Sequence, residues 1–355
     1  MGEILGVGIS HSPLFGMPPD KMSGELRARL NDPKLPAAMR DPANWPEKMR
    51  AEWSDDFGAA AGARHQADML ADFRKVRAAL DEFAPDFIVI WGDDQYENFR
   101  EQIIPPFCIL AFDEVVGKPW AAAPDSRRGY RANIWNEGPD AEIRVKCHRE
   151  AAKYIASALL EQEFDMSYAY EPRFHKGLAH AFLNAVMYLD YERKGFPHRL
   201  VPIAVNCYGR EVISAQGLYA ISEGEPAPPD PPAPSPHRCF TLGAAVARIC
   251  RDSPWRVALM ASSAWSHSFL TPKTHRLMPD VETDQRLYQA MVSGESNFWK
   301  NFSLRELEAA GGGETLNWFG LVGAMAELNH KVAWSSCLET YVFNATKVSV
   351  IFQPA

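Results

Sequence analysis

Residues 87–99 read FIVIWGDDQYENF, an apolar run that ends in a polar stretch. The run is rich in β-branched and aromatic side chains, which is typical of a buried strand. Residues 63–83 before it repeat apolar side chains at helical spacing, and a proline separates the two segments. The sequence therefore predicts a helix followed by a buried strand, with Asp93, Asp94 and Gln95 at the strand's end.

Predicted helices and strands alternate along the rest of the chain. Further strands are expected at 4–9, 200–205 and 257–261, and further helices at 141–160 and 239–251. Such alternation favours an α/β fold, with a central mixed sheet flanked by helices. In folds of this class ligands collect at the loops beyond the strand ends, so we expect the active site there.

The length of 355 residues is compatible with one elaborated α/β domain. We expect a single catalytic domain over residues 1–355. Two stretches fit no regular element: an elaborated loop region at about 14–62, and a Pro-rich surface loop at 223–236.

Composition excludes several classes of protein. The net charge of -8 and the pI of about 5.7 argue against a nucleic-acid partner, because phosphates require a basic face. No apolar stretch is long enough to cross a bilayer, and the first residues lack the basic start of a secretory signal. The six cysteines form no CxxC pair, which excludes a zinc knuckle. We expect a cytoplasmic protein without a membrane partner.

Four polar side chains stand where a site could form. His11 and His267 each follow an apolar run and lie among serines, so each either caps the strand end or points into a cleft. His175 lies among basic residues in EPRFHKGLAH, whereas we assign His180 to another helix face, in the core or on the surface. Glu314 follows three glycines and precedes an apolar helix, as a partner of the helix dipole or as a metal-binding carboxylate.

Six segments, in this order, resemble the class III extradiol ring-cleaving dioxygenases, the superfamily of protocatechuate 4,5-dioxygenase β subunits and dihydroxyphenylpropionate dioxygenases. The segments are GISHSPLFG, PDFIVIWGDDQYENFREQIIPPFCIL, FHKG, PHRCFTLG, ASSAWSHSFL and GGGETLNWFGLVGAM. The resemblance covers most of the chain, but not residues 14–62 or the Pro-rich loop. It implies a dioxygenase-like catalytic domain with non-haem Fe(II) as cofactor.

In that family two histidines and one glutamate hold Fe(II) and leave positions open for a catechol and dioxygen. By position His11 matches the first histidine and Glu314 matches the carboxylate. The second histidine normally closes the turn after the central strand, where this chain has Asp93-Asp94-Gln95. The resemblance thus implies a set of His11, Gln95 and Glu314, with Asp94 or His65 as alternative third ligands.

The resemblance also implies that His175 and His267 are an acid/base pair, because the reaction must remove and return protons and histidine titrates near neutral pH. Tyr96, Trp265 and Trp318 could wall an aromatic pocket, although core packing is the commoner use of such rings.

The expected activity is ring cleavage of a small substituted catechol or methoxylated phenolic acid by a homo-oligomer. Two alternatives stay open. The same fold could carry out a different reaction on an aromatic substrate, with or without metal. The chain could also be a non-catalytic subunit or a ligand-binding protein with a degenerate metal site.

Overall fold

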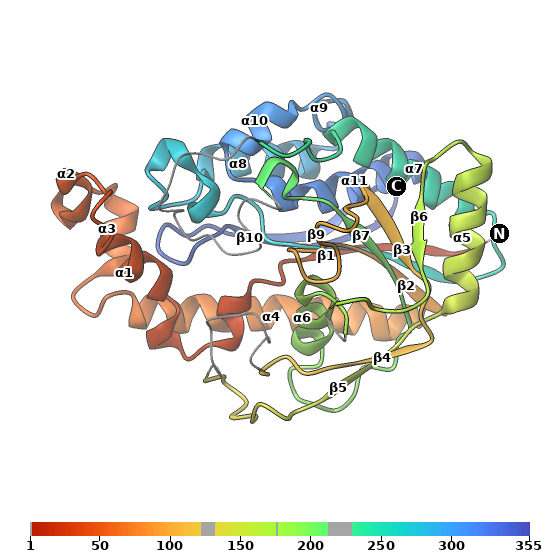
Figure 1. The fold of residues 1–355 in the computed structure, drawn as a ribbon, viewed down its shortest axis with the longest axis horizontal. Helices are drawn as coiled ribbons and strands as arrows, with labels where there is room; N and C mark the ends of the chain where they lie inside the picture. Colours follow the sequence, from red (N-terminus) through yellow and green to blue (C-terminus); the bar gives the residue numbers. More distant parts are fainter. Residues whose placement is uncertain (1, 122–131, 175–176, 212–228) are drawn as a thin grey trace.

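A mixed sheet forms the centre of the computed structural model, which describes residues 2–121, 132–174, 177–211 and 229–355 (Figure 1). Its eight strands, in spatial order, are β6 (Ser167–Ala169), β3 (Phe107–Leu110), β7 (Leu200–Val205), β2 (Phe87–Asp93), β8 (Val257–Ser262), β1 (Ile4–Ile9), β10 (Lys347–Pro354) and β9 (His330–Leu338). The central strands β7, β2, β8 and β1 run parallel, whereas β3 and β10 pair antiparallel on either side of them. The predicted α/β fold with a mixed sheet is confirmed.

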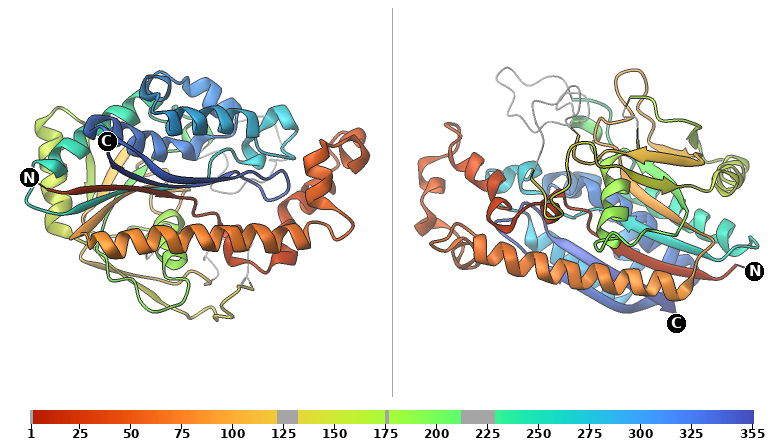
Figure 2. Two further views of the ribbon diagram at one scale, coloured as in Figure 1. Left: turned by 180° about the vertical axis from the view of Figure 1, so that it is seen from behind. Right: turned by 90° about the horizontal axis from the view of Figure 1, so that it is seen from below.

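Helices cover both faces of the sheet, as the views in Figures 1 and 2 show. One face carries α4 (Ala59–Phe83) and α6 (His180–Leu189). The other carries α5 (Arg149–Glu161), α7 (Pro236–Arg251), α9 (Ser296–Lys300) and α11 (Leu316–Leu328), with α8 (Val281–Ser293) and α10 (Leu304–Ala309) beside them. A separate two-stranded sheet pairs β4 (Glu114–Gly117) with β5 (Ile143–Lys146).

The side chains of β2 alternate between the two helical layers, as the period of two in a strand requires. Val89 and Trp91 belong to the core on the α7 and α11 side, whereas Ile88 and Ile90 belong to the core on the α4 and α6 side. The strand ends at Asp93, which by the same alternation points toward the α11 layer. The backbone of this strand therefore places a carboxylate at the carboxyl end of a central strand, next to the start of α11.

Most predicted elements are confirmed, with shifts of a few residues at their ends. The strands at 4–9 and 200–205 have the predicted limits. The strand that begins at Phe87 extends to Asp93, and the strand that begins at Val257 extends to Ser262. The helix predicted at 141–160 is wrong in its first part, where β5 lies. Residues 143–146 alternate apolar and basic side chains, which is the pattern of a strand, and α5 begins only after His148 caps it by accepting from the Ala151 N–H at 3.2 Å.

The expected loop region at about 14–62 contains short helices: α1 (Gly24–Leu30), α2 (Ala37–Arg40) and α3 (Glu47–Trp53), which project on the left of Figure 1. Single 3₁₀ turns lie at η1 (Pro13–Gly16), η2 (Pro19–Lys21), η3 (Pro42–Asn44), η4 (Gly209–Glu211), η5 (Ser268–Leu270), η6 (Pro272–Thr274) and η7 (Gly313–Thr315). Apolar side chains of this region, among them Trp45 and Trp53, form their own cluster with Val342 and Phe343 between β9 and β10. The region is thus a helical arm docked on the β9–β10 connection.

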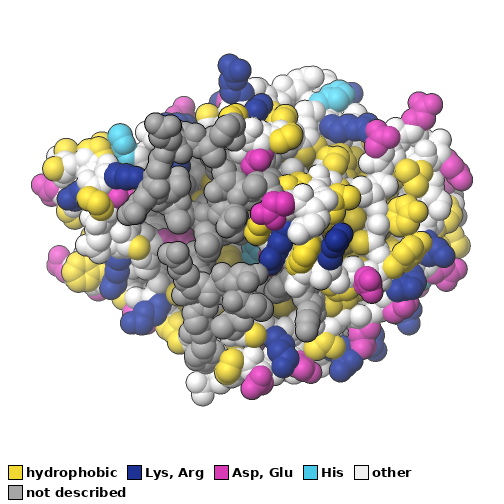
Figure 3. Space-filling view, in the orientation of Figure 1, with side chains coloured by type: hydrophobic (Ala, Val, Ile, Leu, Met, Phe, Trp, Pro, Cys, Tyr) yellow, Lys and Arg dark blue, Asp and Glu magenta, His cyan; other side chains and the backbone are white. Residues whose placement is uncertain are grey.

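Exposed hydrophobic side chains gather on the right of the face drawn in Figure 3. Figure 1 draws α5 and the edge strand β6 on that side. Among the residues that the structure describes, Tyr154 and Leu160 of α5 and Tyr168 of β6 are large exposed hydrophobic side chains. The described residues contain no helix that is both long and apolar enough to cross a membrane. Of the predicted Pro-rich loop, residues 223–228 lie outside the described ranges, and residues 229–235 run without regular structure into α7.

Candidate metal centre

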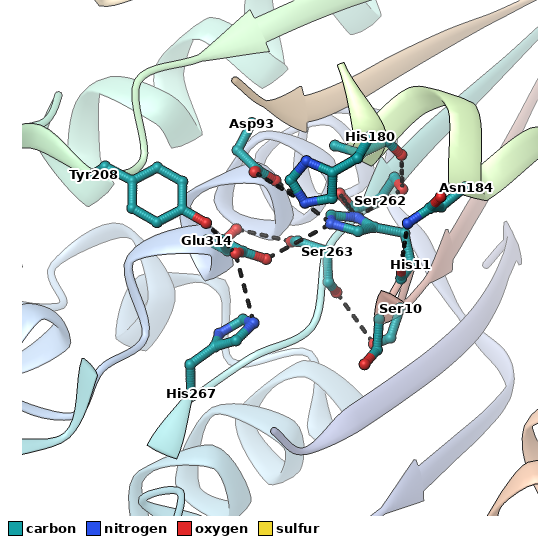
Figure 4. Close-up of polar contacts among 12 residues, drawn as sticks. Ser10, His11, Asp93, His180, Asn184, Tyr208, Ser262, Ser263, His267 and Glu314 are labelled. Atoms are coloured by element: carbon teal, nitrogen blue, oxygen red, sulfur yellow. Dashed lines mark hydrogen bonds and ion pairs between the residues drawn. The ribbon is translucent and has the colours of Figure 1, made fainter. Parts of the chain in front are cut away.

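Four titratable side chains converge at the carboxyl ends of the parallel strands (Figure 4). His11 follows β1, Asp93 ends β2, His180 is the first residue of α6, and Glu314 lies in η7 just before α11. Ligand atoms of His11, Asp93 and His180 all lie within 4.8 Å of one another. Glu314 joins them, since its Oε2 is 3.8 Å from Nε2 of His11.

His11 is fixed with one ring nitrogen turned inward. Its Nδ1 lies 2.9 Å from the carbonyl oxygen of Ser262, which can only accept, so Nδ1 carries the proton and Nε2 presents a lone pair. Burial, and secondly the charge on His180, lowers the pKa of His11 well below its ordinary value, so the ring is neutral. Its Nε2 faces Asp93 Oδ1 and Glu314 Oε2, each at 3.8 Å. A lone pair facing two carboxylate oxygens is repulsive unless a cation lies between them.

Asp93 is fully buried, and neither of its oxygens has a hydrogen-bond partner among the residues that the structure describes. Burial raises the pKa of Asp93 to about 6. A buried polar group without a hydrogen bond costs about 1–3 kcal/mol, and the nearest cation, the His180 ring, lies 4.0 Å from Oδ2. Such a group persists in a folded protein when another ligand satisfies it.

Glu314 reaches the centre because the glycines before it permit close packing. Gly311 has a φ of +68°, and a Cβ there would lie 2.6 Å from the carbonyl oxygen of His267. A Cβ on Gly313 would lie 2.5 Å from the carbonyl oxygen of Cys207. Burial, and then the charge on Asp93, raises the pKa of Glu314 well above its ordinary value.

His180 is held from behind by a carboxylate. Glu97 accepts from the backbone N–H of His180 through Oε1 and contacts Nδ1 through Oε2, both at 2.9 Å. The Nε2 of His180 therefore faces the centre, 4.0 Å from Asp93 Oδ2. Although burial lowers it, the carboxylates of Glu97, Asp93 and Glu314 raise the pKa of His180 to about 10. Histidines that bind metals are commonly oriented by such an outer carboxylate or carbonyl.

His267 and Tyr208 meet the second oxygen of Glu314. The Tyr208 hydroxyl donates to Glu314 Oε1, and His267 Nε2 lies 3.5 Å from the same oxygen. Burial lowers the pKa of His267 to about 3, so this imidazole is neutral. Glu314 thus directs Oε2 toward His11 and Oε1 toward Tyr208 and His267.

The arrangement fits a divalent metal ion. Three carboxyl groups, those of Asp93, Glu97 and Glu314, lie around His180 in a buried space, and a bound cation would favour the ionised form of each. Two atoms that bind one ion lie at most about 4.2 Å apart, twice a bond length of about 2.1 Å. The distances from His11 Nε2 to the two facing carboxylate oxygens, 3.8 Å each, meet that limit. Imidazole nitrogen with carboxylate oxygen is the donor set of non-haem iron sites.

Comparison with curated proteins finds distant relatives, while no family model matches the chain. Proteins named 2,3-dihydroxyphenylpropionate/2,3-dihydroxicinnamic acid 1,2-dioxygenase from Photorhabdus laumondii and Rhodococcus jostii are 22% and 28% identical over 59% and 58% of this chain. The Pseudomonas putida protein named 2,3-dihydroxyphenylpropionate/2,3-dihydroxicinnamic acid 1,2-dioxygenase 2 is 22% identical over 62% of the chain. The chain is a distant relative of these dioxygenases. The resemblance inferred from the sequence motifs is thereby confirmed.

The aligned part of the chain spans 52%, 51% and 60% of the Photorhabdus, Rhodococcus and Pseudomonas dioxygenases respectively. The chain therefore matches only about half of the length of these proteins.

Three of the predicted site residues, His11, His267 and Glu314, come together in the structure. Gln95 is half-buried in the turn that follows β2. Of the alternative third ligands, Asp94 accepts hydrogen bonds from the backbone N–H groups of Glu97, Asn98 and Phe99. The ring of His65, in α4, lies 5.3 Å from that of Phe343 on the β9–β10 connection. Asp94 thus shapes the turn after β2, and a metal-ligand role for either residue stays a prediction.

The three aromatic residues predicted to wall a substrate pocket lie in different parts of the structure. Trp265 and Trp318 are fully buried, with their rings 5.4 Å apart, and belong to the hydrophobic core. Tyr96 is in the turn after β2 with a φ of +59°, and its hydroxyl donates to Glu101. Substrate contacts of these three residues stay predictions. His175 lies outside the described residues.

Sequence reasoning missed Asp93 and His180. The period of two in β2 carries a signal for Asp93, because it predicts the same direction for Val89, Trp91 and Asp93. His180 was assigned to a helix face, but α6 begins at His180, so its ring lies at a helix start and not along a face. The ring is partly exposed and faces the candidate centre, a position that the assignment to the core or surface did not anticipate.

Proposed function

We propose that this chain is a non-haem Fe(II)-dependent dioxygenase that cleaves the ring of a small substituted catechol or methoxylated phenolic acid. One observation carries the proposal: buried carboxylate oxygens of Asp93 and Glu314, unpaired among the described residues, lie beside the inward-facing nitrogen of His11. The similarity to proteins named as dioxygenases of dihydroxylated aromatic acids supports this choice among metal-dependent reactions.

His11 and Glu314 would hold the iron, together with a ligand from the end of β2. When bound, Fe(II) supplies a Lewis acid for phenolic oxygens and a redox centre for dioxygen. The protein's contribution starts with rigid orientation: Ser262 fixes the His11 ring, and Tyr208 fixes the Glu314 carboxylate. Such outer contacts keep the ligand atoms aimed at one point.

Proton transfer would fall to the histidines around the same space. His267 lies with Nε2 3.5 Å from Glu314 Oε1 and would exchange a proton with the substrate from there. We keep His175 as its proposed partner. His180, whose Nδ1 is held by Glu97, also presents Nε2 to the centre and can hold or move a proton there.

The proposal is tested by oxygen consumption. Protein loaded with Fe(II) under anaerobic conditions is mixed with aerated buffer and a panel of substituted catechols and methoxylated phenolic acids. We expect oxygen uptake and a ring-cleaved product with at least one substrate, both abolished in Glu314→Ala. Iron-loaded protein that consumes no oxygen with any of them would contradict the proposal and favour a binding protein.

A further inference from the structure

The turn after β2 offers three consecutive polar side chains, Asp93, Asp94 and Gln95, as the third metal ligand. We infer that Asp93 is that ligand and binds the metal together with His11 and Glu314, next to His180, whose ligand atom lies within 4.8 Å of those of His11 and Asp93. The inference rests on the proposed metal-dependent function and names the residue that completes its site.

Asp93 is placed and oriented for this role by β2 itself. It is the last residue of the strand, and the alternation through Val89 and Trp91 turns its side chain toward the layer of α11, at whose start Glu314 lies. Its Oδ1 is 3.8 Å from His11 Nε2, within the limit of about 4.2 Å for two ligands of one ion. Its side chain is wholly inaccessible to solvent, with both oxygens unpaired among the described residues.

The two neighbours of Asp93 are placed differently. Asp94 is buried too, but its oxygens accept from the backbone N–H groups of Glu97, Asn98 and Phe99 at 2.9–3.2 Å, which satisfies the carboxylate and shapes the turn. Gln95 lies beyond the strand, where the alternation of β2 no longer applies, and is half-buried. Its neutral amide oxygen is also a weaker donor for a divalent cation than a carboxylate.

The charge of the site agrees with a carboxylate in this position. Asp93 and Glu314 together bring two negative charges, which match those of a divalent cation, whereas a set with Gln95 brings one. Without metal, both carboxylate oxygens of Asp93 are buried without a hydrogen bond among the described residues. Removing the charge of Asp93 should therefore weaken metal binding and, at the same time, stabilise the metal-free protein.

The experiment compares Asp93→Asn with Gln95→Ala in the full chain, with wild type and Glu314→Ala alongside. Fe(II) and Co(II) affinities are measured by anaerobic titration, and thermal unfolding is followed with and without metal. We expect Asp93→Asn to weaken both affinities at least tenfold and to raise the unfolding temperature of the metal-free protein. Gln95→Ala should keep both affinities within about threefold of wild type. Because a bound metal stabilises the folded protein in proportion to the logarithm of its affinity, metal should raise the unfolding temperature of Gln95→Ala nearly as much as that of wild type.

Metal affinity lost in Gln95→Ala, or kept in Asp93→Asn, contradicts the inference. A metal-free Asp93→Asn protein that is less stable than wild type also contradicts it, because that result makes Asp93 a structural carboxylate. Failure of the proposed function is distinguishable: there, wild type itself shows no metal binding that depends on Glu314. If Glu314 is required and Asp93 is not, only the ligand assignment falls.

Discussion

Glu52 in the helical arm and Asp93 at the end of β2 are both carboxylates withdrawn from solvent, but their surroundings differ. Glu52 is half-buried and accepts from the N–H groups of Tyr341 and Val342 and from the hydroxyl of Thr340 at 2.7–3.2 Å. Asp93 is fully buried and, within the described ranges, accepts nothing. The satisfied carboxylate joins two parts of the fold, whereas the unsatisfied one costs stability and must be retained for another reason.

The histidines of the two regions differ in the same way. His65 packs against Phe343 within the arm's junction, while His11 turns Nε2 toward two carboxylates. Burial lowers the pKa of both well below its ordinary value. The Nε2 of His65 is also buried without a hydrogen-bond partner among the described residues. Burial, a shifted pKa and an unpartnered nitrogen therefore do not separate the two histidines, whereas the two carboxylates facing His11 Nε2 do.

The largest expected effect separates these two histidines. His11→Ala should weaken Fe(II) binding by more than about 100-fold, beyond the 10- to 100-fold typical of losing an outer contact. His65→Ala should leave iron affinity unchanged and lower the free energy of unfolding by about 1–3 kcal/mol, because a buried ring is removed. Anaerobic iron titration and denaturant unfolding of both variants measure this. Iron loss in His65→Ala would erase the contrast between the regions.

A smaller effect is expected behind His180. Glu97→Gln should lower turnover about 10- to 100-fold, because the ring loses the carboxylate that holds Nδ1. Glu101→Gln is the matched control, since it makes the same change four residues later, at a carboxylate whose partner is the Tyr96 hydroxyl. Steady-state oxygen uptake gives kcat and KM for both. Equal kinetics in the two variants would show that the contact between Glu97 and His180 does not matter for the reaction.

At the arm's junction the expected loss is in stability alone. Glu52→Gln should lower the free energy of unfolding by about 1–2 kcal/mol, because charge-assisted hydrogen bonds to three donors are weakened. Asp55→Asn, at an exposed position nearby, serves as control and should change stability by less than about 0.5 kcal/mol. Urea denaturation measures both. Weakened iron binding in Glu52→Gln would show that the junction and the site are coupled.

The smallest effect concerns Lys347, which is buried at the same junction. Burial lowers the pKa of its amine from 10.5 to about 7 in the folded protein, while Glu52 and Glu25 oppose the shift. The unfolded chain thus binds more protons between pH 7 and 10.5, so this group's contribution to the free energy of unfolding rises with pH across that window.

From pH 7 to 8 the rise should be about 1 kcal/mol, below the limit of about 1.4 kcal/mol for one proton per pH unit. Lys347→Met removes the titrating group, so the pH slopes of wild type and variant should differ by this amount. Unfolding measured at several pH values gives the difference. Parallel slopes would mean that Lys347 stays charged when the protein folds.

Much of the fold could be predicted because apolar runs and turn residues mark the central strands directly. The limits of the strand at 200–205 follow from its apolar composition. The error at 141–160 arose where a short strand, β5, lies directly before a helix with similar composition. The helical arm at 14–62 was missed because its helices are short and interrupted by prolines, so no long periodic pattern exists.

The site was predictable where a side chain directly follows a strand or a glycine run, as His11, His267 and Glu314 do. Asp93 and His180 depend on details of backbone geometry: how far β2 extends, and where α6 begins. A shift of one or two residues at such an end turns a side chain in another direction, and a sequence alone does not fix element ends to that accuracy.

The central claim is that the unsatisfied carboxylates at the strand ends belong to a metal site. It is tested most directly by the iron content of protein produced with ferrous iron and kept anaerobic, in wild type and in Glu314→Ala. We expect close to one iron per chain in wild type and only a trace in the variant, with both proteins folded by circular dichroism. The same trace of iron in both would contradict it.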